Sequence, residues 1–208
     1  MPQITFHHNH ANHCWIILSG WGILAEHVIP PVDDSNMLYI SHYDPFTLHH
    51  LIPELLTTYA ITSYCVLGVS LGGLWLSLHQ NLFPDSAKNC YLGIRKYYKK
   101  SHLLPILTSL KTNKVQCLDQ FYQQCCATKS QYLELRKAHR LFTFDPAILL
   151  NGLQFLEQYA FHVEQSCPNY SFFHGQLDRI SPVKELSWVS NEKLTIYNRV
   201  GHLFSPSL

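Results

Sequence analysis

The sequence Gly-Val-Ser-Leu-Gly at 68–72 matches the pattern G-x-S-x-G, in which a serine stands on a sharp turn between a strand and a helix. Apolar residues at 63–68 precede the pattern, and a second apolar stretch at 71–81 follows it. This is the strand, turn and helix that such a serine requires, because the glycines permit the tight turn and leave the hydroxyl accessible. The alternative is that Ser70 is only a small residue at a helix start. We predict that Ser70 is a nucleophile.

A serine hydroxyl becomes a good nucleophile when a histidine accepts its proton and a carboxylate orients that histidine. In this type of turn both partners follow the serine in the chain, the acid first. Asp178 comes directly after a predicted strand at 170–174, and His202 follows the last predicted strand, at 194–197. Either residue alone would more often be a turn or surface group. The order and the placement after strands predict that Asp178 and His202 complete a triad.

Acyl transfer also requires two backbone N–H groups that stabilise the negative oxygen of the intermediate. One comes from the residue after the nucleophile, which is Leu71, and the other from a loop after an earlier strand. The sequence Ser-Gly-Trp-Gly at 19–22 follows an apolar strand candidate at 14–19, and its glycines allow the main chain to approach a substrate. We predict Leu71 and Trp21 as the two donors, with a simple turn at 19–22 as the alternative.

Fourteen histidines raise the question of a metal site, above all those near the amino end. His7 and His8 would point to opposite faces of a strand, and no cysteine or carboxylate completes a recognised ligand spacing with His10 and His13. Cys125 and Cys126 are adjacent and do not form a C-x-x-C pair. We therefore expect neither a metal nor a cofactor.

The arrangement of apolar stretches predicts the elements that position these residues. Strands are expected at 4–7, 14–19, 37–41, 63–68, 88–94, 170–174 and 194–197, and helices at 46–58, 71–81 and 182–189. From 95 to about 159 the pattern is helical, with breaks at Pro105 and Pro146. Strands that alternate with helices predict an α/β fold with a mostly parallel central sheet and helices on both faces. The domains are then a core at 1–94 and 160–208, and a helical lid at 95–159.

Charge is unevenly distributed along the chain, although the net charge is only +1. Residues 95–140 contain ten basic and two acidic residues, a formal charge of +8, and the remainder carries −7. Such a segment is suited to an anionic partner, whereas a merely solvated helix face usually mixes both signs. No nucleic-acid recognition motif accompanies the basic residues, so we expect no nucleic-acid binding.

Size and composition indicate one globular unit in a reducing compartment. The chain has 208 residues, of which 47% are hydrophobic and 14% charged. No apolar run reaches the length of a membrane span, and no secretion signal is recognised. The seven cysteines are an odd number and are scattered, so we expect reduced thiols in a cytoplasmic, monomeric protein without membrane contact.

Taken together, these motifs resemble the α/β-hydrolases and, more narrowly, the pimeloyl-acyl-carrier-protein methyl ester esterases of biotin synthesis. The narrower signal is the combination of Gly-Trp-Gly at 20–22 with Leu-Asn-Gly at 150–152, near the end of the lid. The serine turn at 67–73, the acid loop at 174–182 and Gly-His at 201–202 are common to many α/β-hydrolases. The match is poorest at 25–53 and in the middle of the lid, and Ser19 stands where many relatives have histidine.

The resemblance implies an α/β-hydrolase fold with a lid that receives an acyl carrier protein, a small acidic partner. It implies removal of the methyl ester from a carrier-bound dicarboxylic acyl chain. The helical clustering of Arg136, Lys137 and Arg140 predicts that these residues bind the carrier. Two alternatives stay open: a general esterase or thioesterase that acts on small substrates, and a catalytically silent hydrolase domain that only binds an acidic protein.

Overall fold

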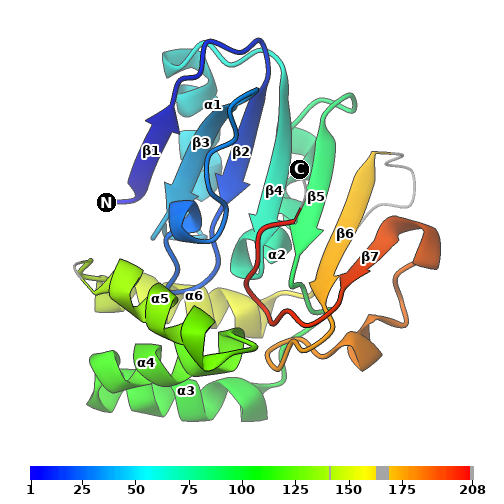
Figure 1. The fold of residues 1–208 in the computed structure, drawn as a ribbon. Helices are drawn as coiled ribbons and strands as arrows, with labels where there is room; N and C mark the ends of the chain where they lie inside the picture. Colours follow the sequence, from blue (N-terminus) through cyan, green and yellow to red (C-terminus); the bar gives the residue numbers. More distant parts are fainter. Residues whose placement is uncertain (141, 163–168, 207–208) are drawn as a thin grey trace.

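The computed structural model describes residues 1–140, 142–162 and 169–206, and a seven-stranded sheet forms its centre (Figure 1). The order of strands across the sheet is β1-β3-β2-β4-β5-β6-β7. Only β1 is antiparallel to its neighbour, β3, and all other neighbouring strands are parallel. The strands are β1 Gln3–His7, β2 Cys14–Leu18, β3 Asn36–Ser41, β4 Tyr64–Val69, β5 Lys88–Leu92, β6 Tyr170–Gly175 and β7 Leu194–Tyr197.

The central strands are buried because the sheet is covered on both faces. All five residues of β2 are buried, as are the last four of β4 and of β5. Strands of this kind carry continuous apolar runs instead of alternating polar and apolar residues. The strands at the two edges, β1 and β7, have no fully buried residue.

Two helices cover one face of the sheet, the face at the rear in Figure 1: α1 Leu48–Thr58 and α2 Leu71–Leu78. They connect β3 to β4 and β4 to β5, and both connections run in the same direction across the sheet. Right-handed crossovers in one direction place their helices on the same face. The connection from β2 to β3 runs the opposite way and contains only the short 3₁₀ helix η1, Ala25–His27.

Four helices lie between β5 and β6 in the chain, and Figure 1 shows them below the carboxyl ends of the parallel strands. They make up the lid, and three of them begin at side chains that bind the first backbone N–H groups: Asn113, Thr128 and Asp145. The helices are α3 Lys100–Thr112, α4 Lys114–Cys125, α5 Lys129–His139 and α6 Pro146–Gln158.

The predicted mostly parallel sheet with helices and a helical insertion is confirmed, with two local corrections. Pro105 does not break the lid but lies inside α3, within its first two turns, where a missing N–H removes a single hydrogen bond. The helix expected at 182–189 is only a 3₁₀ turn, Val183–Leu186. Pro182 precedes it with an extended backbone.

The described cysteines are all free thiols, while Cys167 lies outside the described residues. Burial raises the pKa of the Cys14 thiol to about 11 and that of Cys90 to about 12, so both are protonated at neutral pH. Within the described part of the chain, no helix has both the length and the apolar character that crossing a membrane requires.

Candidate active site

Ser70 stands at the end of β4, on a turn with an uncommon backbone conformation. Its φ is 51° and its ψ is −108°, a region that side chains other than glycine rarely occupy and that costs about 1–3 kcal/mol. The Ser70 N–H donates to the carbonyl of Leu92 on β5 over 2.8 Å. Gly72 permits the turn, because a Cβ atom there would lie 2.3 Å from the Leu18 carbonyl oxygen. The sheet therefore presents Ser70 at its carboxyl edge, next to the first turn of α2.

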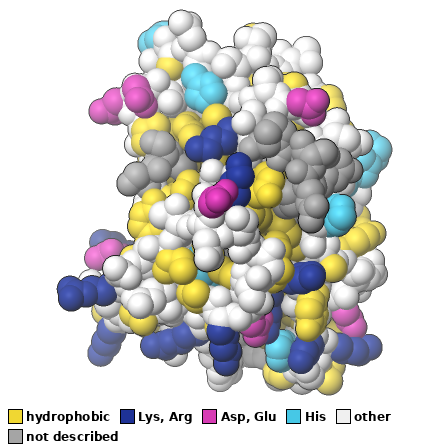
Figure 2. All heavy atoms as spheres, turned by 90° about the vertical axis from the view of Figure 1, so that its right-hand side faces the viewer, with side chains coloured by type: hydrophobic (Ala, Val, Ile, Leu, Met, Phe, Trp, Pro, Cys, Tyr) yellow, Lys and Arg dark blue, Asp and Glu magenta, His cyan; other side chains and the backbone are white. Residues whose placement is uncertain are grey.

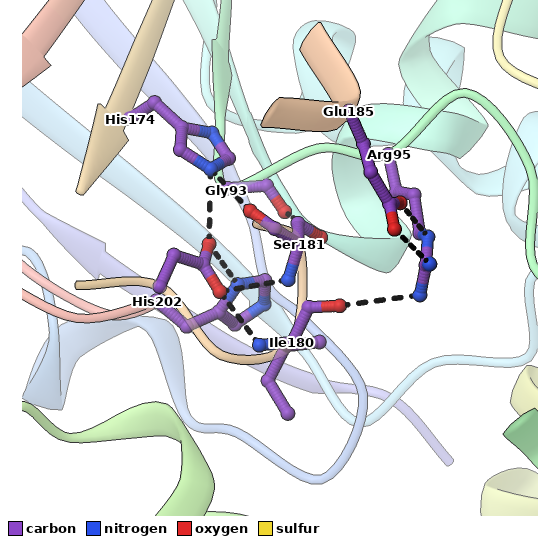
Figure 3. A network of polar contacts seen from close by, with 8 residues as sticks. Gly93, Arg95, His174, Ile180, Ser181, Glu185 and His202 are labelled. Atoms are coloured by element: carbon purple, nitrogen blue, oxygen red, sulfur yellow. Dashed lines mark hydrogen bonds and ion pairs between the residues drawn. The ribbon is translucent and has the colours of Figure 1, made fainter. Parts of the chain in front are cut away.

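The structure brings Asp178 and His202 together. The His202 ring donates from Nδ1 to Asp178 Oδ2 over 2.8 Å, and both side chains are fully buried. The second oxygen, Oδ1, accepts the N–H groups of Ile180 over 2.8 Å and of Ser181 over 2.7 Å (Figure 3). The carboxylate is thus fixed by backbone donors on one side and orients the imidazole on the other. Nε2 of His202 is buried and has no hydrogen-bond partner among the described residues.

His174 supports the acid loop from the end of β6. Its Nε2 donates to the Ser181 carbonyl and lies 3.3 Å from Asp178 Oδ2. Burial lowers the pKa of His174 and the neighbouring Asp178 opposes that shift, so the ring is neutral at neutral pH. Sequence reasoning missed this role, although the spacing His174-x-x-x-Asp178 places both residues in one tight loop.

The lid positions the loop that contains His202. The His202 N–H donates to the carbonyl of Cys125, the last residue of α4, over 2.8 Å. Gly201 makes this approach possible, because a Cβ atom there would lie 2.4 Å from the same carbonyl oxygen. On the other side the ring packs against Gly93, where an added Cβ would be 3.0 Å from the imidazole. Helix α4 and the loop after β5 therefore enclose His202.

The loop after β2 lies against Ser70. A Cβ atom at Gly20 would be 3.4 Å from the Ser70 Cβ, so the main chain of this loop approaches the serine closely. Leu71 is the first residue of α2, and its N–H therefore has no carbonyl partner within the helix. The amide N–H of Trp21 has no hydrogen-bond partner among the described residues. Leu71 directly follows Ser70, and Trp21 lines the same cavity as Ser70, so both residues lie near the serine and their role as donors stays a prediction.

Three lid helices bind the loop at 21–24. The Trp21 indole donates to the Leu149 carbonyl over 2.8 Å, and the Tyr122 hydroxyl donates to the Gly22 carbonyl over 2.9 Å. The Leu24 N–H donates to Nε2 of His139 over 2.8 Å. Together these bonds attach the loop to α6, α4 and α5.

Gly152 is the last residue of the Leu-Asn-Gly sequence at 150–152, and it packs against Trp21 of the Gly-Trp-Gly sequence at 20–22. A Cβ atom at Gly152 would lie 2.7 Å from the Trp21 ring, so only glycine lets α6 pack this closely on the indole. The neighbouring Asn151 donates from Nδ2 to Asp44 Oδ2 over 2.8 Å and ties α6 to the loop after β3. The two sequence signals, 20–22 and 150–152, thus meet in space.

His139 makes the free energy of unfolding depend on pH. Its Nδ1 donates to the Leu135 carbonyl and its Nε2 accepts from Leu24, so the folded protein requires the neutral ring. Burial, with a smaller contribution from His27, lowers the pKa of His139 to about 4. The unfolded chain binds this proton near pH 6.5. Stability from this group is therefore complete above pH 6.5 and decreases toward pH 4, by about 3 kcal/mol in all.

We expect His139→Gln to weaken this pH dependence, because the glutamine oxygen can accept the Leu24 N–H without titrating. Urea unfolding at several pH values between 7.5 and 4.5 measures the effect, with the exposed His50→Gln as the matched control. Wild type and the control should lose stability in parallel on acidification. An equally steep loss in His139→Gln would contradict this assignment.

A cavity of about 420 Å³ leads to Ser70 between the lid and the acid loop. The lid helices contribute most of its apolar lining, and its polar and charged groups come from the segment before α3, from α3 and α4, and from the segment 179–185. The apolar lining comprises Trp21, Leu103, Pro105, Ile106, Phe121, Leu153, Leu156, Ile180 and Pro182. The polar lining includes Tyr98, Arg95, His102, Gln124, Arg179, Lys184 and Glu185. The cavity therefore offers both apolar surface and polar or charged groups beside Ser70.

Comparison with solved structures identifies the fold. An esterase from Exiguobacterium antarcticum superposes with a TM-score of 0.76 at 13% identity, covering 97% of this chain and 88% of the esterase. A bromoperoxidase from Bacillus anthracis gives 0.76 at 12% identity, covering 97% and 88%. BioG from Haemophilus influenzae gives 0.67 at 12% identity, covering 96% and 93%. No protein-family model and no curated protein matches the sequence.

The chain has the α/β-hydrolase fold. The strand, turn and helix around Ser70 occupy the centre of its sheet, and the segments with Asp178 and His202 follow β6 and β7. The sequence predicts the chain order serine, acid, histidine. In the fold these residues follow β4, β6 and β7 in that order, and the three strands end at the same edge of the sheet.

The three selected lid cations do not line the cavity at Ser70. Arg136, Lys137 and Arg140 are exposed and line a separate groove of about 640 Å³ between α4, α5 and the segment after α5. Arg136 also forms an ion pair with Asp119, with 2.9 Å between Nε and Oδ1. Figure 2 shows Lys and Arg side chains along the lower part of the molecule, where the lid lies in this α/β-hydrolase fold. Arg95, Arg179 and Lys184 line the cavity itself, and sequence reasoning missed Arg179 and Lys184 because they lie in or just after the acid loop, outside the basic segment.

The amino-terminal histidines do not assemble a site. Within the described ranges, no group of three His, Cys, Asp or Glu side chains has a geometry that could hold a metal ion. The rings of His8 and His10 lie 4.5 Å apart, and His13 pairs with Ser63 over 3.1 Å.

Proposed function

We propose that the protein is a serine carboxylester hydrolase. The observation that carries this proposal is the buried 2.8 Å hydrogen bond from His202 to Asp178, at the sheet edge where Ser70 stands on a strained turn. A neutral histidine fixed in this way keeps Nε2 free to accept a proton. The accessible cavity at Ser70 adds room for a substrate.

The reaction follows from the positions of these groups. Ser70 Oγ attacks the ester carbonyl carbon while His202 Nε2 takes the hydroxyl proton, and Asp178 stabilises the imidazolium. The oxygen of the tetrahedral intermediate accepts hydrogen bonds from the Leu71 and Trp21 N–H groups. The carbon–oxygen bond to the alcohol then breaks, and His202 returns the proton to the departing alcohol. Water then attacks the acyl carbon while His202 takes its proton. The bond to Ser70 Oγ breaks, and His202 returns the proton to Ser70.

As substrate we propose a methyl ester on a dicarboxylic acyl chain that is bound to an acyl carrier protein. The sequence resemblance to the esterases of biotin synthesis supports this choice, and so does the similarity to BioG. The apolar residues that the lid helices contribute to the cavity suit the methylene chain. Methanol is then the first product and the free carboxylate on the carrier is the second.

The lid supplies the surface that an acidic carrier would approach. Residues 95–140 carry a formal charge of +8, which attracts an acidic partner over a distance of about 10 Å in 0.1 M salt. The groove between α4 and α5 combines Arg136, Lys137 and Arg140 with the exposed apolar side chains of Val115 and Leu133, exposed by 73% and 49%. We propose that these groups contact the carrier.

The test of this function is the loss of the methyl group from pimeloyl-carrier methyl ester, followed by mass spectrometry. Hydrolysis of the carrier substrate at a much higher kcat/KM than a nitrophenyl or methyl ester of a small acid supports the proposal. Equal kcat/KM values would identify a general esterase. No hydrolysis of any ester and no labelling by a serine-reactive probe would identify a silent binding domain.

Charge reversal on the lid should weaken the carrier substrate selectively. For the variant with Arg136→Glu, Lys137→Glu and Arg140→Glu we expect KM for the carrier ester to rise about tenfold at low salt, with kcat little changed. The effect should shrink as salt is raised to about 0.5 M, because salt screens exposed charges. The control is the exposed Lys88→Glu, at the opposite end of β5. An equal loss on a small neutral ester would refute the docking assignment.

A further inference from the structure

A second cavity, of about 450 Å³, adjoins the cavity at Ser70, and we call it the outer cavity. The two cavities share three lining residues, Arg95, His102 and Glu185, so they meet at these side chains. The outer cavity is otherwise lined by residues 96, 97 and 99, before and at the start of α3, and by residues 187 and 188. A long substrate with its ester at Ser70 can therefore extend past the shared residues into the outer cavity.

The boundary between the two cavities is a fixed ion pair. Nε of Arg95 lies 2.5 Å from Oε2 of Glu185, and Nη2 donates to Oε1 over 2.7 Å (Figure 3). The Arg95 guanidinium also lies over the ring of Tyr98, 5.5 Å from its centre. Among the described residues that line either cavity, Glu185 is the only acid. Because Glu185 neutralises Arg95, no acid is left to balance the other cations of the outer cavity.

Two lysines of the outer cavity, Lys96 and Lys99, carry this surplus of positive charge. Both are exposed, and neither forms an ion pair with any residue that the structure describes. Their backbone is held in place, because the Phe161 N–H donates to the Lys96 carbonyl over 2.7 Å and Lys99 is the cap residue of α3. Cations are unfavourable at the amino end of a helix, and the first turn of α3 contains no acid. An anion in the outer cavity would offset this surplus.

We propose that the outer cavity binds the phosphate of the phosphopantetheine arm by which an acyl carrier protein holds its acyl chain. The inference rests on the proposed function, because this arm is part of the proposed substrate. The acyl chain lies in the cavity at Ser70, and the arm continues past Arg95 and Glu185. Lys96 and Lys99 then bind the phosphate oxygens. No covalent bond changes in this step.

The chemistry of the outer cavity favours the phosphate over the other parts of the arm. Lysine ammonium groups only donate hydrogen bonds, whereas phosphate oxygens accept them and carry the opposite charge. The rest of the arm consists of uncharged amide, hydroxyl and methylene groups. Since the phosphate belongs to the arm, its binding can be measured without the carrier protein. The assignment is therefore independent of the groove between α4 and α5.

The test uses two substrates that differ only in the phosphate, the methyl esters of pimeloyl-phosphopantetheine and of pimeloyl-pantetheine. We expect the wild-type kcat/KM to be about fivefold higher with the phosphate, as for two exposed ion pairs of ordinary strength. In the double variant Lys96→Gln, Lys99→Gln this ratio should fall to about 1. The matched control is Lys111→Gln, Lys129→Gln, which changes the net charge equally at exposed residues that line neither cavity. The control should keep the fivefold ratio.

An undiminished ratio in the double variant would overturn the inference, as would equal kcat/KM values for the two substrates in wild type. An equal fall of the ratio in the control would also overturn it, because the phosphate would then respond only to the overall charge of the lid.

A binding measurement separates failure of this site from failure of the proposed function. If neither ester is hydrolysed, calorimetric titration with phosphopantetheine and with pantetheine replaces turnover as the measurement. Binding that requires both the phosphate and the two lysines would reject the esterase but keep the phosphate site. Equal binding of the two compounds, or no binding of either, would reject the phosphate site.

Discussion

Replacing Ser70 with alanine should lower kcat by about 10⁶-fold while the fold persists. The hydroxyl forms the covalent intermediate, so its loss removes the reaction path and not merely one favourable contact. The backbone strain at Ser70 belongs to the turn between β4 and α2 and is independent of the hydroxyl. The thermal midpoint of unfolding should accordingly change little. Turnover of pimeloyl-carrier methyl ester, or of a nitrophenyl ester, measures the effect.

The matched control for this variant is Ser187→Ala, which removes the hydroxyl of an exposed serine outside the serine turn. The control should retain wild-type kcat and the same labelling by a fluorophosphonate. Turnover in Ser70→Ala within tenfold of wild type would refute the nucleophile and, with it, the proposed mechanism.

Asp178→Asn should lower kcat by about 10⁴-fold, because it forces the wrong tautomer on His202. Oδ1 of Asp178 accepts two backbone N–H groups, those of Ile180 and Ser181. An asparagine satisfies these donors only with its carbonyl oxygen, and its NH₂ group then faces His202 Nδ1. Nδ1 must become the acceptor and Nε2 must carry the proton. A histidine in that state cannot take the proton of Ser70.

The measurement is kcat for an ester whose chemistry limits the rate, with the exposed Asp33→Asn as control. We expect KM to change much less than kcat, since Asp178 is buried away from the cavity lining. The tautomer itself is visible in the ¹⁵N shifts of His202, where the protonated nitrogen should change from Nδ1 to Nε2. A loss of less than tenfold, or an unchanged tautomer, would show that Asp178 does not orient His202.

The sequence predicts the sheet and the residues at its edge because both depend on local patterns. Short apolar runs mark β2, β4 and β5, whose residues are buried on both faces. Ser70 follows β4, Asp178 follows β6 and His202 follows β7, and parallel strands bring their carboxyl ends to one edge. At that edge the structure joins Asp178 to His202, and the catalytic roles of the three residues stay predictions.

What the sequence does not predict are contacts between segments that are distant in the chain. Nothing local relates His139 to Leu24, or Cys125 to His202, because these pairs meet only when the lid packs on the core. Helical clustering selected Arg136, which faces a separate groove, since spacing on one helix does not reveal the neighbouring elements.

The attachment of the lid has a consequence for how this part of the chain can evolve. At Leu149, Gly22 and Cys125 the accepting atom is a backbone carbonyl, which every residue type supplies. A substitution at such an acceptor position leaves the hydrogen bond intact wherever the new side chain fits. At Gly22 the close packing limits which side chains fit. The donors, by contrast, include the specific side chains of Trp21 and Tyr122. Changes of side chain at Leu149 and Cys125 therefore need not break these bonds, whereas changes at Trp21, Tyr122 or His139 remove a donor or an acceptor that attaches the lid.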